Sequence, residues 1–189
     1  MAAEPAEAVG LADLSGEALA RSIRSLGEQV GAPDGLVTGT LFWYSLSGAL
    51  ARAALLQGVD LADPGLEVRP GPGGWPQAVT ARPGGPNLSC LPDPIPEIAA
   101  VSGARERALW ALATDSVANA ALEAGLDPAA VVAALGPGAP PPRTATVGGR
   151  RVIRRGSCCL IYLCPGMSKC ASCPRQPPEE RIERIARIG

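Results

Sequence analysis

The chain contains no histidine. This absence excludes metal sites that need an imidazole ligand, such as Cys₂His₂ and Cys₃His zinc sites and histidine-ligated Rieske clusters. It also excludes catalysis by a Ser/His/Asp triad or a Cys/His pair. Any metal centre in this protein must therefore use other ligands.

Aromatic residues are scarce, at 3% of a chain in which 47% of the residues are hydrophobic. Much of the hydrophobic content is alanine, so we expect a largely helical core of Ala, Leu and Val. Nucleotide-binding motifs are also missing. The glycines of residues 70–74 have neither the G-x-G-x-x-G nor the G-x-x-x-x-G-K-[ST] spacing, and we find no flavin or nicotinamide motif.

The sequence has no strong candidate for a membrane span or a secretory signal. The uncharged stretch Leu36–Ala51 has sixteen residues, fewer than the roughly 18–20 apolar residues of a span, and predicts a buried helix. Met1–Gly10 is acidic and lacks the apolar region of a signal peptide. We therefore expect a cytoplasmic protein with no integral membrane span, in a reducing compartment that disfavours disulfides.

Hydrophobic periodicity predicts an α+β fold with a mainly helical body. We expect helices over residues 15–30, 36–57, 95–124 (with a break near Ser102-Gly103) and 127–136. Short strands are expected at residues 66–69 and 77–82, and residues 1–12 are expected to be frayed. The predicted body spans residues 1–142, with the short strands in an insertion near residues 59–94.

Three polar or aromatic residues of this body have simple expected roles. Trp43 and Tyr44 lie in an apolar helix, where aromatic side chains are usually part of the core. Asp115 is expected to form an exposed or intrahelical ion pair, which is a common and weak interaction.

Residues 143–189 form a second predicted segment, after a proline-rich linker at residues 137–142. Residues 144–147 and 150–154 predict a β-hairpin, because Gly148-Gly149 suits the positive φ angles of a two-residue turn. A short amphipathic helix is expected at residues 179–188. The segment has 10 Lys+Arg and 3 Asp+Glu, which gives it a net charge of +7. Residues 1–142 have 7 Lys+Arg and 15 Asp+Glu, for a net charge of −8.

Five of the six cysteines lie between positions 158 and 173. The C-x-x-C turn of Cys170 and Cys173 can direct two thiolates to one metal. Cys158 and Cys159 are adjacent, so an extended backbone would point their thiols apart, and an irregular turn is needed. Gly156 is a candidate for permitting that turn. We expect the intervening loop to fold back and bring the four sulfurs together.

The spacing leaves three uses for these cysteines open. An all-cysteine set suits a 2Fe–2S cluster, whose two irons need two sulfurs each, or a tetrahedral zinc ion. Zinc ribbons normally have two C-x-x-C turns, and this chain has one. Catalysis by a free thiol is the third use. Cys164 is an additional thiol that packs or substitutes for a ligand, and Cys90 is expected to be an ordinary buried or half-buried thiol.

Residues 154–173 resemble the C-terminal signature of the FhuF-like ferric siderophore reductases, C-C-x(10)-C-x(2)-C. The flanking Arg-Arg-x-Ser before Cys158, the Pro165-Gly166 turn and Cys173-Pro174 also match. Residues 95–124, which include Arg107-Ala-Leu-Trp110, resemble a segment of the same family more weakly. The resemblance implies a 2Fe–2S cluster held by Cys158, Cys159, Cys170 and Cys173. It also implies one-electron reduction of a ferric siderophore, typically of the hydroxamate type.

The resemblance also implies partners and a substrate surface. The candidates for contact with the siderophore are Arg107, Trp110, Arg154 and Arg155. Electrons would come from a separate donor, either a ferredoxin or a flavin- or NAD(P)H-dependent reductase, and no nucleic acid partner is expected. The alternatives are a non-enzymatic 2Fe–2S electron carrier or redox sensor, and a zinc-stabilised binding module whose basic tail contacts nucleic acid.

Overall fold

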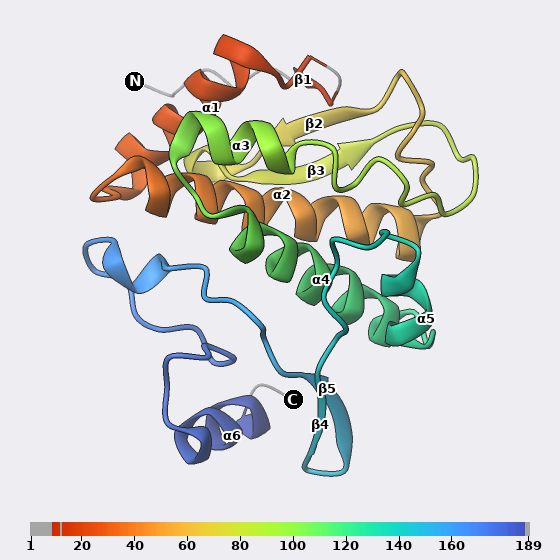
Figure 1. Cartoon of the computed structure of the whole chain (residues 1–189), viewed down its shortest axis with the longest axis vertical. Coiled ribbons are helices and arrows are strands. Elements are labelled where there is room, and N and C mark those ends of the chain that lie inside the picture. Colours follow the sequence, from red (N-terminus) through yellow and green to blue (C-terminus); the bar gives the residue numbers. More distant parts are fainter. Residues whose placement is uncertain (1–8, 12, 188–189) are drawn as a thin grey trace.

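The computed structural model describes residues 9–11 and 13–187. The described chain has the predicted α+β fold: helices pack around one central helix, and two small antiparallel sheets lie at different ends of the molecule (Figure 1). None of the described helices has both the length and the hydropathy needed to cross a membrane. The division of the chain at residue 142 stays a prediction.

Helix α2 (Gly35–Gln57) is the centre of the body. The Asp34 carboxylate accepts a hydrogen bond from the Val37 N–H at its start, and Gly58 ends it in the left-handed conformation. Because α2 is apolar nearly all round, it packs on several elements at once. These are α1 (Gly16–Val30), α3 (Ile95–Ser102), α4 (Glu106–Glu123) and β3 (Pro76–Thr80).

The pairing of α2 with α4 forms the part of the core nearest the cysteines. Trp43 is fully buried, as predicted, and its Nε1–H donates to the Leu109 carbonyl over 2.8 Å. The same prediction is wrong for Tyr44, which is 39% exposed. The hydroxyls of Ser47 and Ser116 are 2.9 Å apart across the same interface. These polar contacts fix the two helices relative to each other, and α4 then carries the C-terminal segment on its other side (Figure 1).

The first sheet has the order β1 (Val9–Gly10), β2 (Glu67–Pro70), β3, with antiparallel neighbours. Val68 pairs with Val9 on one side and Val79 on the other. The expectation of a frayed start is therefore wrong for Val9–Gly10, because this segment supplies an edge strand. The rest of that prediction, at residues 1–8 and 12, lies outside the described residues.

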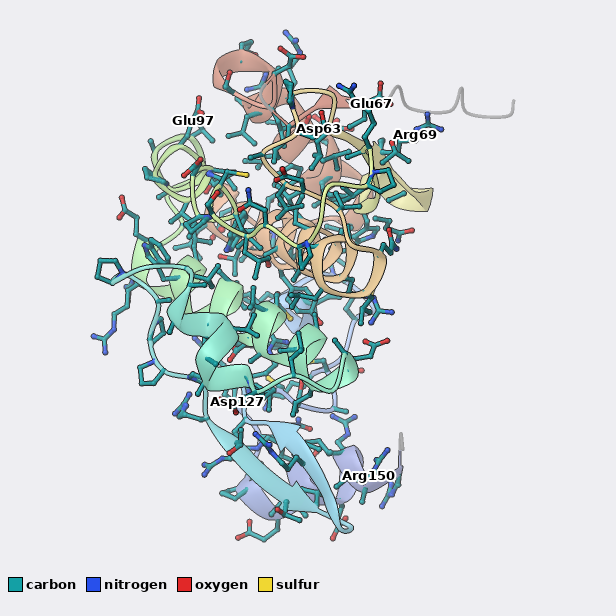
Figure 2. The ribbon with its side chains drawn as sticks, turned by 90° about the vertical axis from the view of Figure 1, so that its right-hand side faces the viewer. Asp63, Glu67, Arg69, Glu97, Asp127 and Arg150 are labelled. Carbon is teal, nitrogen blue, oxygen red and sulfur yellow. The ribbon has the colours of Figure 1, made fainter. Side chains whose placement is uncertain are left out.

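The second sheet is the predicted hairpin, β4 (Thr144–Val147) and β5 (Arg150–Ile153). Gly148 and Gly149 have φ angles of 57° and 79°, so the turn has the positive φ pair expected for two residues. Asp127, which caps α5 (Pro128–Ala133), lies 3.8 Å from the Arg151 guanidinium of the hairpin. Figure 2 shows Arg150 on this hairpin, at the opposite end of the molecule from Asp63, Glu67 and Glu97.

The chain after the hairpin is mostly irregular. It contains a short 3-10 turn, η2 (Ile161–Leu163), and the terminal helix α6 (Pro178–Arg187). The predicted apolar face of α6 is not buried: Ile182 is 51% exposed, and position 188 lies outside the described residues. The proline-rich stretch before the hairpin packs on α4, where the Thr114 hydroxyl donates to the Pro140 carbonyl over 3.1 Å.

Candidate metal centre

The chain leaving β5 is anchored to α4 by hydrogen bonds. The Gly156 N–H donates to both carboxylate oxygens of Asp115, at 2.8 and 3.1 Å. The Arg154 N–H donates to the Arg143 carbonyl over 2.7 Å, and the Arg143 guanidinium donates to the Arg155 carbonyl over 3.0 Å. These contacts determine where the following Cys158 and Cys159 lie.

The irregular turn required by the vicinal cysteines is at Leu160. Its φ is 66°, and among the described residues it is the only non-glycine with a positive φ. The Leu160 N–H points back to the Cys158 sulfur, 3.4 Å away. The expectation that Gly156 makes this turn is therefore wrong, since the φ of Gly156 is not among the positive ones and its role is the contact with Asp115.

The second pair of cysteines is positioned by two residues that were not predicted from the sequence. The Cys173 N–H donates to the Cys170 carbonyl over 3.0 Å and closes the C-x-x-C turn. The buried Gln176 amide donates to the Cys170 carbonyl over 2.8 Å, and the Arg184 guanidinium of α6 donates to the Gln176 side chain. Helix α6 therefore supports the turn through hydrogen bonds. Gln176 follows the motif by only three residues, but no pattern pointed to Arg184.

The four predicted ligand sulfurs lie in one connected group. The sulfurs of Cys158 and Cys173 are 3.5 Å apart. The thiols of Cys158 and Cys170 hydrogen-bond to the Cys159 sulfur, which lowers the pKa of Cys159 and raises the pKa values of Cys158 and Cys170. The structure thus joins the vicinal pair to the C-x-x-C pair through contacts between their sulfurs.

The remaining two cysteines have different surroundings, although Cys164 lies near enough to Cys159 for the charge of that sulfur to contribute to raising the Cys164 pKa, after burial. Cys164 is 3% exposed and belongs to the hydrophobic core cluster. Cys90 is half-buried and donates from its thiol to the Leu61 carbonyl over 2.9 Å, as expected for an ordinary thiol. Among the described residues, no three Cys, His, Asp or Glu side chains converge on a point that would hold a single metal ion. A 2Fe–2S centre would take two sulfurs for each iron, which is the number that the four predicted ligand cysteines supply.

Arg155 provides a separate test of whether a negatively charged cluster fits here. It is 5% exposed, and one guanidinium nitrogen, Nη1, lies 3.4 Å from the Cys170 sulfur. Its Nε and Nη2 are, within the part of the chain that the structure describes, the buried side-chain polar atoms without a hydrogen-bond partner. Buried donors normally have partners, so two unpaired donors beside thiolates suit a cofactor with acceptor sulfurs.

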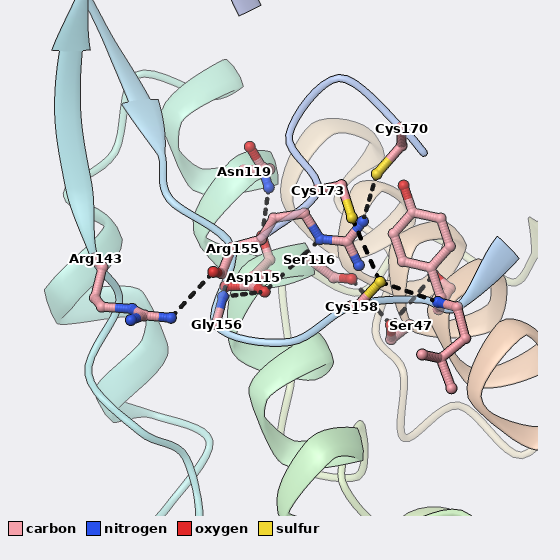
Figure 3. A network of polar contacts seen from close by, with 12 residues as sticks. Ser47, Asp115, Ser116, Asn119, Arg143, Arg155, Gly156, Cys158, Cys170 and Cys173 are labelled. Carbon is pink, nitrogen blue, oxygen red and sulfur yellow. Dashed lines mark hydrogen bonds and ion pairs between the residues drawn. The ribbon is translucent and has the colours of Figure 1, made fainter. Parts of the chain in front are cut away.

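Asp115 lies beside this arginine (Figure 3), and the ring of Tyr44 packs against it. The Arg155 guanidinium lies over the Tyr44 ring, 4.5 Å from its centroid, and its Nε is 3.9 Å from the Asp115 carboxylate. Asp115 is 5% exposed, and its burial raises its pKa to about 6 despite the hydrogen bond from Gly156. The expectation of an ordinary exposed or intrahelical pair is wrong for Asp115. The sequence signal that could have indicated the burial of Asp115 is an acidic residue among the apolar positions of a helix.

Comparison with known proteins identifies the segment that contains this centre. Residues 155–175 match the family model described as the FhuF 2Fe-2S C-terminal domain. This segment is therefore similar to FhuF-type 2Fe–2S domains. Comparison with curated proteins and with solved structures gave no match. The resemblance seen in the sequence is confirmed over this FhuF segment (residues 155–175), which contains all four predicted ligands, and its cofactor is a 2Fe–2S cluster.

The residues predicted to face the substrate lie in different surroundings. Arg107 and Trp110 line a groove of about 820 Å³ with Arg143, and none of the four ligand cysteines is among the described residues that line it. Arg154 is exposed, whereas Arg155 is buried beside Cys170. A different groove, of about 520 Å³, reaches Cys158 itself. The role of these residues toward a substrate stays a prediction.

Proposed function

We propose that the protein is a ferric siderophore reductase that transfers one electron to the chelated iron. The observation that supports this most strongly is the match of residues 155–175 to the FhuF 2Fe-2S C-terminal domain. Two observations within that segment support the proposal: the sulfurs of Cys158 and Cys173 are 3.5 Å apart, and a buried arginine beside Cys170 has donors without a partner among the described residues. The alternatives of a simple electron carrier or a redox sensor use the same cofactor and differ in the acceptor.

The proposed reaction needs no proton-transfer residue. A siderophore holds ferric iron through hard oxygen donors, and ferrous iron, which has a lower charge, is held less tightly. The balance is one ferric siderophore plus one electron, giving ferrous iron and the free siderophore. When bound, the 2Fe–2S centre supplies that electron. The protein must hold the cysteines, exclude water from them and admit the chelate close to the centre.

The groove at Cys158 is the surface that we propose for the chelate. It is lined by Cys158 and Leu160 from the FhuF segment, and by two exposed arginines, Arg105 and Arg175. A chelate in this groove would lie next to a cluster ligand. The two guanidinium groups would attract anionic groups of the siderophore, and hydroxamate siderophores are the class that the family resemblance favours.

A separate protein is proposed as the electron donor, because the sequence has no flavin or nicotinamide motif. The positive charge of residues 143–189 would attract an acidic ferredoxin or a flavin- or NAD(P)H-dependent reductase. The exposed Arg154 is one candidate contact. Reduction of this kind would take place in the cytoplasm, where such donors are kept reduced.

The activity is tested by following reoxidation of the reduced protein. The anaerobic holoprotein is reduced with dithionite, freed of excess reductant and mixed with a ferric hydroxamate and a ferrous chelator. We expect the visible spectrum of the oxidised cluster to return while the ferrous complex forms in equal amount. A cluster that stays reduced in this mixture would contradict the reductase proposal and would favour the carrier or sensor alternative.

The docking surface is tested with variants of the same holoprotein. Arg105→Gln and Arg175→Gln should raise the KM for the ferric hydroxamate severalfold, and should leave the visible spectrum unchanged. Arg107→Gln and Trp110→Ala are the matched controls in the larger groove. A rise in KM with these two variants alone would move the docking surface to that groove.

A further inference from the structure

Arg155 is the buried cation of the metal centre, and the reductase proposal gives it no role in the reaction. Its side chain is 5% exposed, and it reaches the cysteines from the end of the hairpin rather than from the C-x-x-C turn. Burying a charge without partners is expensive. We therefore expect the positive charge of Arg155 to have a function that a neutral, apolar residue could not perform.

The surroundings of Arg155 keep it charged and fix its orientation. Burial alone would lower its pKa, but its interaction with Cys159 raises the pKa above the ordinary arginine value. The Tyr44 ring supports one face of the guanidinium, and the Asp115 carboxylate lies 3.9 Å from Nε. A planar guanidinium held in this way presents its N–H groups in fixed directions.

Two of its donor atoms have no hydrogen-bond partner in the part of the chain that the structure describes. Nη1 is 3.4 Å from the Cys170 sulfur and the guanidinium also interacts with Cys159, whereas Nε and Nη2 are buried without a hydrogen-bond partner among the described residues. The Asp115 carboxylate, 3.9 Å from Nε, is too far away to accept a hydrogen bond from it and accepts from the Gly156 N–H instead. The unpaired donors therefore belong to acceptors that come with the cofactor.

We propose that Arg155 is the positioning residue that sets the reduction potential of the 2Fe–2S centre, by donating hydrogen bonds to its sulfurs and placing a fixed positive charge beside it. Charge near the cluster and hydrogen bonds to its sulfurs are two of the means by which proteins adjust such potentials. Asp115 opposes the effect by placing a negative charge behind the guanidinium, and Tyr44 holds the guanidinium in place. This inference rests on the 2Fe–2S cofactor and does not depend on the identity of the substrate.

The sign of the effect follows from the charges. Reduction adds one negative charge to the centre, so a positive charge beside it favours the reduced form. Removing the charge of Arg155 should therefore lower the potential, and removing the charge of Asp115 should raise it. A residue that only stabilises the fold would not move the potential in opposite directions in these two variants.

The test is a redox titration of anaerobic holoprotein, followed by visible absorption and by the electron paramagnetic resonance of the reduced form. It is done near pH 8, well above the Asp115 pKa of about 6, so that this carboxylate is ionised. For Arg155→Gln we expect reduction by a given donor to become at least about tenfold less favourable, which is 59 mV for one electron. Asp115→Asn should shift the equilibrium severalfold the other way.

Three further variants make the result specific. Arg155→Lys keeps the charge but not the planar donors, so its shift should have the same sign as that of Arg155→Gln and be smaller. Arg154→Gln removes an exposed neighbouring charge that solvent screens, and its shift should be less than twofold. Tyr44→Phe keeps the supporting ring and should also shift the equilibrium less than twofold.

Several results would overturn the proposal. An unchanged potential in Arg155→Gln would do so, as would a shift of the same sign in Arg155→Gln and Asp115→Asn. Should Arg155→Gln fail to retain its cluster, Asp115→Asn and Arg155→Lys decide: a raised potential in the first and a lowered one in the second support the proposal, and any other pair of signs contradicts it.

Discussion

The helical body and the FhuF segment are stabilised in different ways. The body buries leucine, isoleucine and alanine side chains between α2 and its neighbouring helices. The FhuF segment has little regular secondary structure, and the groups that it buries include thiols and a guanidinium, with the buried Gln176 amide directly after it. Apolar burial stabilises the first without any ligand, whereas buried polar groups stabilise only when all their partners are present.

This difference shows which part of the protein depends on its cofactor. The body presents a rigid surface, α4, on which Asp115 receives the Gly156 N–H. The segment then runs from α4 to the cysteines and back to α6, supported at both ends by hydrogen bonds. We therefore expect loss of the cofactor to loosen the segment and to leave the body folded.

The largest effect that separates the two regions should come from replacing a ligand. Cys158→Ser or Cys173→Ser should abolish the visible absorption of the cluster, because a serine hydroxyl is a poor substitute for a thiolate on iron. The far-ultraviolet circular dichroism of the helices should persist. Cys90→Ser is the matched control and should retain the cluster. Equal cluster content in the ligand variants and the control would contradict the ligand set.

A substitution in the core of the helical body should lower the stability of the fold and leave the cluster spectrum unchanged. Trp43→Ala removes a fully buried ring and its hydrogen bond to the Leu109 carbonyl, and should lower the free energy of unfolding by ~3–5 kcal/mol. Denaturant titrations followed by helix content and by cluster absorption measure this. While the variant is folded, its cluster spectrum should match that of the wild type, and a changed spectrum would show that the two regions are coupled more strongly.

A smaller effect is expected from the contact that joins α6 to the C-x-x-C turn. Gln176→Ala leaves the Cys170 carbonyl and the Arg184 guanidinium without their partner, at a cost of about 1–3 kcal/mol. The cluster should be lost to a chelator several times faster than in the wild type, and Gln57→Ala, at an exposed position of α2, is the control. Equal rates of loss would mean that α6 does not support the turn.

The smallest effect should come from the turn after the vicinal cysteines. At a φ of 66°, a residue with a side chain costs roughly 1–2 kcal/mol, and β-branching makes this worse. Leu160→Val should therefore destabilise the holoprotein, whereas Leu160→Gly relieves the strain while it loses the packing of the leucine, for a net change below about 1 kcal/mol. Thermal unfolding of the two variants measures the difference, and equal destabilisation by both would contradict the strain at Leu160.

The features of local origin were predictable from the sequence. The helix ends at Gly31, Gly58 and Gly103 follow from glycine itself, since all three adopt the left-handed conformation. The Gly148-Gly149 hairpin and the cysteine spacing are also local signals. These features were sufficient to predict the helices, the hairpin and the four clustered thiols.

The features that depend on distant contacts were not predictable. Asp115 and Gly156 are 41 positions apart, so nothing in either neighbourhood indicates their hydrogen bond. The pairing of Val9 with Val68 is equally non-local. Arg155 looked like one of several arginines in a basic segment, and only its burial in the fold distinguishes it from the exposed Arg154.

The most direct test of the metal centre is the composition and colour of the full chain, purified without oxygen. We predict two irons and two acid-labile sulfides for each chain, with the visible absorption of an oxidised 2Fe–2S cluster that bleaches on addition of dithionite. A colourless protein that contains one equivalent of zinc would contradict this.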